Sequence, residues 1–258
     1  MLQLQMIERV KQVSLENPAI SAVLMYGSFI KGEGDQYSDI EFYIFHTGDY
    51  MPEKMEFINN ISPVSLFFVN EFGTEVAVFT NMIRGEFHFH PVTGIEIIKT
   101  WQGGTSFEYR DKMNLVDKDG RLSDVLASIN EPLRPVYDTQ ENKEFLALNL
   151  INNLLFEQNL LLRKEYAHAH QLFWFIQRYL LWMIRLHVGM DDHWESPTKK
   201  LEKELPEEWY QKYRQCVPEL EEVSLRKSFI FVLDISDYLF KKLEISSSIY
   251  DVLKKIKL

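Results

Sequence analysis

The chain has 258 residues, of which 46% are hydrophobic and 26% are charged, a balance typical of a globular protein with a substantial core. The formal net charge of −10 argues against a general nucleic-acid-binding protein, which would carry a basic stripe. The single cysteine, Cys216, excludes an intrachain disulfide and a thiolate zinc cluster, so a reducing cytoplasm is the expected location.

The sequence predicts no membrane association. Residues 1–13 are amphipathic and contain charges, and they lack the apolar run of a signal peptide. The most apolar segment, residues 172–184, is interrupted by Gln177 and Arg178. It therefore falls short of the roughly 20 apolar residues that a membrane-spanning helix requires.

The first half of the chain has the pattern of a mixed α/β domain. A helix is expected up to about Asn17, another over residues 51–60, and a loop at residues 117–120. Five runs of apolar or alternating residues have the length and composition of strands. They cover residues 22–26, 39–45, 65–69, 74–79 and 84–90.

The second half has apolar residues at helical spacing and no run typical of a strand. Pro132 and Pro135 predict a linker near residues 131–140, and Gly189 is expected to end a long helix. We therefore expect two domains, a mixed α/β domain over residues 1–135 and an antiparallel helical bundle over residues 136–258. The expected helices cover residues 141–165, 167–188, 197–204, 206–214 and 219–244.

Gly27 and Ser28 interrupt the chain between the first two strands, and Asp39 and Glu41 begin the second strand. Alternation along a strand places these two acids on one face, where they repel each other unless a cation lies between them. Mg²⁺ prefers such oxygen ligands and combines one or two carboxylates with substrate phosphates. Backbone N–H groups in a glycine turn form an anion site, to which Ser28 adds a hydroxyl. The pattern therefore predicts a phosphate-binding turn beside metal-binding acids.

The spacing of Gly27-Ser28, ten residues, then Asp39-x-Glu41 resembles the nucleotidyltransferase superfamily related to DNA polymerase beta. Residues 27–45 and 83–89 are similar to the lincosamide nucleotidyltransferases, antibiotic-resistance enzymes that attach a nucleoside monophosphate to a drug hydroxyl. The resemblance is dense over about the first ninety residues and thinner afterwards. Glu41 stands where the superfamily commonly has Asp, which lengthens the ligand arm by one methylene.

The resemblance implies an NTP substrate, ATP or GTP, and Mg²⁺, with two metal ions in the site, held by Asp39 and Glu41. The β- and γ-phosphates are expected at Gly27-Ser28. Lys31 and Lys199 are candidate triphosphate contacts because lysine acts as a point charge, and a solvated surface role is the alternative for each.

Glu86 is the third acid, and by resemblance it is the catalytic base that takes a proton from the acceptor hydroxyl. Glu75, also on an expected strand, is the alternative base. His88 shares a strand face with Glu86 and, together with Tyr166, is a candidate contact for the acceptor. His88 and His90 could instead bind a metal, although a structural or substrate-contact role is favoured.

We therefore expect an antibiotic-modifying nucleotidyltransferase that acts on a lincosamide such as lincomycin or clindamycin, with its site between two domains. Another acceptor, such as an aminoglycoside or a protein hydroxyl, is the first alternative, and a non-catalytic interaction module of the same fold is the second. The expected partners are the nucleotide and the antibiotic, without nucleic acid. An exposed apolar face of the helical bundle would allow a homodimer.

Overall fold

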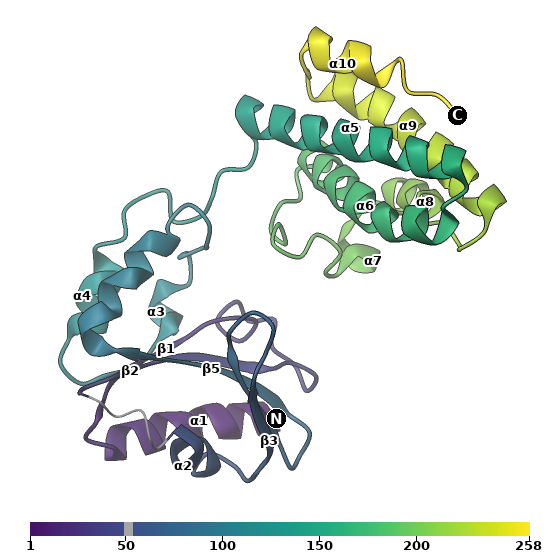
Figure 1. Cartoon of the computed structure of the whole chain (residues 1–258). Coiled ribbons are helices and arrows are strands. Elements are labelled where there is room, and N and C mark those ends of the chain that lie inside the picture. Colours follow the sequence, from purple (N-terminus) through teal and green to yellow (C-terminus); the bar gives the residue numbers. More distant parts are fainter. Residues whose placement is uncertain (49–53) are drawn as a thin grey trace. The chain divides into compact units, whose positions relative to one another are not determined.

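A computed structural model describes residues 1–48 and 54–258, which divide into two compact units, Met1–Pro135 and Val136–Leu258 (Figure 1). The first unit is built around a mixed β-sheet with helices on both faces, and the second is built from helices. The α/β region followed by a helical region that the sequence predicts is confirmed. None of the helices in the described residues is long and apolar enough to cross a membrane.

The six strands of the first unit form one sheet in the order β3-β4-β5-β2-β1-β6. Strands β2 and β5 run parallel, whereas the other neighbouring strands pair antiparallel. The strands are β1 (Ile20–Met25), β2 (Ile40–His46), β3 (Val64–Val69), β4 (Glu75–Phe79), β5 (Arg84–Pro91) and β6 (Asn114–Asp117).

The five expected strands are all present, and strand β6 is the addition that the sequence did not predict. Its four residues pair antiparallel with β1 at the edge of the sheet. A run this short has no recognisable alternation, because two residues on each face are too few to establish a period. The loop expected at residues 117–120 consequently begins one residue too early.

Helices α1 (Leu2–Glu16) and α2 (Lys54–Asn59) lie on one face of this sheet, and α3 (Arg110–Met113) and α4 (Arg121–Ala127) lie on the other (Figure 1). The 3₁₀ helix η2 (Val92–Trp101) packs with α4. The expected first helix is confirmed. Of the helix expected over residues 51–60, residues 51–53 lie outside the described residues.

The sheet separates two apolar cores, and the alternation of β2 and β5 decides which side chains reach each one. Phe42 and Phe87 are fully buried in the core beneath α1 and α2. Successive strand residues point to opposite faces, so Glu41, Tyr43 and Glu86 lie on the other face. Tyr43 packs at the edge of the second core, which η2, α3 and α4 cover. Glu41, Tyr43 and Glu86 therefore share one face of the sheet.

The second unit is a bundle in which α5 and α6 form a long antiparallel pair and α9 packs against both. All five expected helices are present, and Gly189 ends α6 at φ +70°, as predicted. The sequence did not predict the short α10. The helices are α5 (Gln140–Arg163), α6 (Tyr166–Val188), α7 (Leu201–Glu204), α8 (Glu207–Gln215), α9 (Glu222–Lys242) and α10 (Ser247–Leu253).

Glu157 lies on the buried face of α5 and is completely inaccessible to solvent. Neither carboxylate oxygen has a hydrogen-bond partner among the described residues. Burial raises the pKa of Glu157 to about 8, because the charged form loses its hydration. The native state therefore keeps this side chain protonated at neutral pH.

We predict that this proton makes the stability of the chain depend on pH. Between the unfolded pKa near 4.5 and the folded value near 8, the native state binds the extra proton, so its stability falls as pH rises. Glu157→Met should remove this loss, which is on the order of a few kcal/mol at pH 8. Urea unfolding at pH 5, 7 and 8 measures it. Glu195→Met, the same change at an exposed carboxylate, is the control, and equal pH slopes for Glu157→Met and the wild type would contradict the prediction.

Candidate active site

Strand pairing brings two of the predicted acids together. Glu41 of β2 and Glu86 of β5 are directly opposite each other in the parallel ladder, so both side chains extend from the same face of the sheet. Tyr26 follows β1 and reaches this face from the other side of β2, with its backbone N–H donating to the Glu41 carbonyl at 3.1 Å. The acids therefore lie beside the segment that leads into the glycine-serine turn.

Gly27 holds the turn against Glu41. Its φ is +82°, a conformation that residues with a side chain rarely adopt. A Cβ added to Gly27 would overlap the carboxylate of Glu41. Glycine is therefore favoured by the backbone conformation, and its lack of a side chain leaves room for the Glu41 carboxylate in its present orientation.

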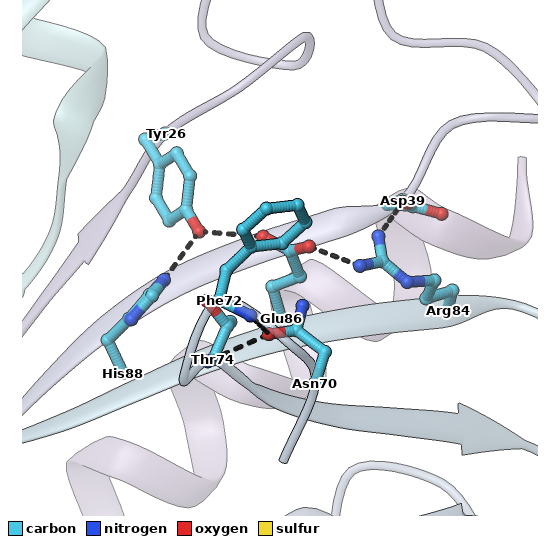
Figure 2. Close-up of polar contacts among 8 residues, drawn as sticks. All are labelled: Tyr26, Asp39, Asn70, Phe72, Thr74, Arg84, Glu86 and His88. Atoms are coloured by element: carbon cyan, nitrogen blue, oxygen red, sulfur yellow. Dashed lines mark hydrogen bonds and ion pairs between the residues drawn. The ribbon is translucent and has the colours of Figure 1, made fainter. Parts of the chain in front are cut away.

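Arg84 joins the remaining acids. Its guanidinium forms ion pairs with Asp39, immediately before β2, and with Glu86, two residues further along β5 (Figure 2). Burial alone lowers the pKa of Arg84, but hydrogen bonds to the two carboxylates more than offset this and raise it. The arginine therefore stays charged and neutralises part of the repulsion among the three acids.

Tyr26 connects Glu86 to His88. The Tyr26 hydroxyl donates to Glu86 Oε2 at 3.3 Å and lies 3.0 Å from His88 Nε2 (Figure 2). Burial, followed by the charges of Glu41 and Glu86, raises the pKa of Tyr26, so the phenol stays protonated. Burial lowers the pKa of His88, although the charge of Glu86 opposes this. Neutral His88 can therefore accept or donate a hydrogen bond.

An aromatic cluster lies beside this network on the same face. The Tyr43 ring stacks on His88 with centroids 4.2 Å apart, and Trp101 of η2 is tilted against Tyr43 at 4.6 Å. Tyr26 contacts Tyr43 at 5.2 Å. These contacts fix the rings around the acids. Rings held in this way provide flat apolar surface next to charged groups.

Asp39 and Glu41 have the oxygen donors that Mg²⁺ prefers, and Gly27 leaves the room that the Glu41 carboxylate needs. Within residues 1–48 and 54–258, however, no three His, Cys, Asp or Glu side chains come together as a metal-binding group. Mg²⁺ uses one or two carboxylates and completes its shell with phosphate oxygens and water. The donor pair therefore fits a magnesium ion that binds together with a phosphate ligand.

The predicted site residues fall in both units. Ser28 lies in the turn after Gly27, where its carbonyl accepts from the backbone N–H of Glu33 at 3.0 Å, and Lys31 follows in the same loop. Lys199 and Tyr166 belong to the helical unit. The Lys199 carbonyl accepts from Arg185 at 3.0 Å, and Tyr166 begins α6. Their contacts with nucleotide and acceptor remain predictions.

Glu75, the alternative base, lies away from the acids. It is opposite Phe87 in the antiparallel β4–β5 pair, and Phe87 faces the core beneath α1 and α2. Glu75 also forms an ion pair with Lys54 of α2. Because Glu86 extends from the other face, Glu75 and Glu86 lie on opposite sides of the sheet.

Arg84, Tyr26 and Tyr43 are the members of the site to which the sequence assigned no role. Arg84 and Glu86 are two residues apart on an expected strand, which places them on one face. This spacing could have predicted the ion pair between Arg84 and Glu86. The approach of Arg84 to Asp39 depends on the pairing of β2 with β5, which the sequence alone does not fix.

A mixed sheet with acids beside a glycine turn, followed by a helical unit, is the arrangement that the sequence predicts. Residues 139–257 match the family model described as the lincosamide nucleotidyltransferase-like, C-terminal domain. This match covers the helical unit of the chain and agrees with the resemblance that the sequence predicts. No curated protein matches the sequence.

Two solved structures are similar to this chain at low identity. One is the crystal structure of an aminoglycoside 6-adenyltransferase from Bacillus subtilis, with 13% identity, coverage of 97% of this chain and 95% of that chain, and a TM-score of 0.44. The other is a nucleotidyltransferase-like protein from Exiguobacterium sibiricum 255-15, with 12% identity, coverage of 92% and 78%, and a TM-score of 0.37. Likenesses of this degree do not assign an acceptor.

We predict that Gly27→Ala destabilises the chain more than Gly32→Ala does. Gly32 lies in the same loop at φ +74°, but a Cβ there meets no atom within 4 Å. Both variants incur the backbone cost of about 1–2 kcal/mol, and only Gly27→Ala must also displace the Glu41 carboxylate. Urea unfolding of the two variants measures the difference. Equal losses would show that Glu41 yields to the added methyl group without cost.

Proposed function

We propose that this protein transfers a nucleoside monophosphate from an NTP to a hydroxyl group of a lincosamide antibiotic and thereby inactivates the drug. The observation that carries the proposal is the grouping of Glu41, Glu86 and Asp39 beside the Gly27-Ser28 turn. The family match of the helical half supports a lincosamide as the acceptor. Nucleoside triphosphates are available in the cytoplasm, where we place the reaction.

The glycine-serine turn is the proposed site for the β- and γ-phosphates. Backbone N–H groups of such a turn and the Ser28 hydroxyl donate hydrogen bonds to anions, and Lys31 from the same loop adds positive charge. Lys199 is the proposed cation from the helical unit. Because the chain has a net charge of −10, these local donors must overcome an unfavourable overall field.

Asp39 and Glu41 are the proposed ligands of Mg²⁺, and the resemblance implies two ions in the site. When bound, magnesium supplies positive charge against the phosphate oxygens of the nucleotide. Asp39 is ion-paired with Arg84. Arg84 therefore provides part of the positive charge that Asp39 needs before any ligand binds, and its five N–H donors suit phosphate oxygens as well as carboxylates.

Glu86 is the proposed general base. It takes the proton from the acceptor hydroxyl as that oxygen bonds to the α-phosphorus, while the bond from the α-phosphorus to pyrophosphate breaks. The Tyr26 hydroxyl donates to Glu86 Oε2 at 3.3 Å and so holds the carboxylate in one orientation. His88, 3.0 Å from the same hydroxyl, and Tyr166 are the proposed acceptor contacts.

We also propose that two chains associate through the helical unit. Each chain would then contribute one complete set of the acids described above, because all three belong to the first unit.

The direct test is mass spectrometry of lincomycin and clindamycin after incubation with the protein, Mg²⁺ and each NTP separately. We expect the drug mass to increase by one nucleoside monophosphate, with equimolar pyrophosphate released. The same assay with aminoglycosides identifies another acceptor. Transfer confined to aminoglycosides would contradict the lincosamide assignment, and absence of transfer to every acceptor would contradict the enzyme assignment.

We predict that Glu86→Gln lowers kcat by about 10²- to 10⁴-fold, because the amide cannot accept the proton. Asp39→Asn should lower the rate by a similar factor and raise the Mg²⁺ concentration that the reaction requires. Glu75→Gln is the matched control, since Glu75 lies on the opposite face of the sheet, and it should keep most of the activity. Thermal unfolding of each variant shows whether the fold survives. A Glu75→Gln loss equal to that of Glu86→Gln would contradict the assignment of the base.

A further inference from the structure

The charged side chains of the site occupy neighbouring positions on one face of the sheet. Glu41 is opposite Glu86 in the parallel ladder of β2 and β5. Continued by two residues, the same register places Asp39 opposite Arg84. Residues two apart on a strand share a face. Three carboxylates and one guanidinium are therefore grouped in a square, and the guanidinium leaves part of their negative charge uncompensated.

Arg84 bridges two acids that have different proposed roles. Its Nη1 is ion-paired with Asp39, a proposed magnesium ligand, and its Nη2 is ion-paired with Glu86, the proposed base (Figure 2). In-line transfer requires the α-phosphorus to lie between the metal-bound phosphate oxygens and the attacking hydroxyl. Asp39 marks the first of these positions and Glu86 the second. The guanidinium therefore spans the interval in which the α-phosphate has to lie.

Arg84 competes with a metal ion for Asp39. Mg²⁺ coordinates carboxylate oxygens at about 2.0–2.1 Å. An ion bound to Asp39 is consequently close to the guanidinium that is paired with the same carboxylate. Two cations at such a separation repel each other. Arg84 therefore opposes the binding of a metal ion without nucleotide, and its pairing with Asp39 has to yield when the ion binds.

A phosphate oxygen is a suitable new partner for Arg84. The planar guanidinium carries five N–H donors and binds phosphate oxygens as readily as carboxylates. Its Nη1 can turn from Asp39 to a phosphate oxygen held beside that residue, while Nη2 keeps its contact with Glu86. When Glu86 takes the acceptor proton, the carboxylate loses its charge and attracts Arg84 less. The guanidinium is then available to the phosphoryl oxygens as the bond to pyrophosphate breaks.

A purely structural role for Arg84 makes the opposite prediction for metal binding. If Arg84 only holds the acids in place, its removal should leave them disordered or mutually repelled, and the metal ion should bind more weakly. If Arg84 competes for Asp39, its removal should allow tighter binding of the ion. The two roles can therefore be distinguished by the sign of one measured change.

We propose that Arg84 is a further catalytic residue, which exchanges Asp39 for an oxygen of the α-phosphate when the nucleotide and its metal ion bind together. The phosphate contact rests on the function proposed above, whereas the competition for Asp39 does not. In the absence of nucleotide, the pairing of Arg84 with Asp39 and Glu86 keeps both carboxylates occupied. Metal and nucleotide therefore bind cooperatively.

The first experiment measures metal binding without any transfer. Electron paramagnetic resonance follows the binding of Mn²⁺, which takes the same oxygen ligands as Mg²⁺. Without nucleotide, Arg84→Gln should bind Mn²⁺ about tenfold more tightly than the wild type, because the competing charge is gone. With α,β-methylene ATP or GTP present, this advantage should be lost. Unchanged or weaker Mn²⁺ binding by Arg84→Gln without nucleotide would overturn the competition.

The second experiment measures transfer by steady-state kinetics. Loss of one donor to the reacting group typically lowers kcat by about 10²- to 10³-fold, and Arg84→Gln should show a loss of this size. Arg84→Lys keeps the charge but lacks the planar fork. It should bind Mn²⁺ as weakly as the wild type and recover only part of kcat. Wild-type kcat in either variant would overturn the phosphate contact.

Arg121→Gln is the matched control. Arg121 is ion-paired with Asp119 in the same unit, and its replacement should change neither Mn²⁺ binding nor transfer. Effects equal to those of Arg84→Gln would overturn the proposal. Thermal unfolding shows whether each variant is folded, and Arg84→Lys provides the kinetic test if Arg84→Gln is not. If the wild type transfers to no acceptor, the proposed function fails, and the Mn²⁺ titration still tests the competition.

Discussion

The parallel pairing of β2 with β5 is the constraint on which the candidate site depends. It places Glu41 directly opposite Glu86, two carboxylates at neighbouring positions on one sheet face. Like charges in this arrangement oppose the pairing unless positive charge is close by. Arg84, from the same strand as Glu86, supplies that charge and also draws in Asp39. The fold therefore holds Asp39 and Glu86 against one guanidinium, and Glu41 opposite Glu86, before any ligand arrives.

Burial and hydrogen bonds around the acids favour one protonation state for Tyr26 and for His88 and fix the contacts of Glu86. Tyr26 remains protonated beside Glu86, and burial favours the neutral form of His88. Glu86 thus accepts a hydrogen bond from a fixed phenol on one side and pairs with Arg84 on the other (Figure 2). A carboxylate held in this way has little rotational freedom to lose when it accepts a proton from an alcohol.

Local patterns sufficed for most of the fold because alternation and helical spacing are properties of short segments. The acids at the glycine turn were recognisable for the same reason, since Gly27, Asp39 and Glu41 lie within fifteen residues. Short edge elements such as β6 and α10 carry too few residues to establish a period. Arg84 escaped notice because its contact with Asp39 spans 45 positions in sequence and arises only when β2 and β5 pair. The prediction of the site was incomplete because the pairing of β2 with β5, which joins distant parts of the sequence, cannot be read from local patterns.

Because Gly27 lies so close to Glu41, the residue at position 27 affects which acid fits at position 41. A side chain at position 27 requires either a shorter acid at position 41 or a shift of the Glu41 carboxylate from its present orientation. In chains descended from a common ancestor, these two sites should therefore change as a pair. Where aspartate replaces the glutamate, the requirement for space relaxes, and the left-handed backbone alone continues to favour glycine.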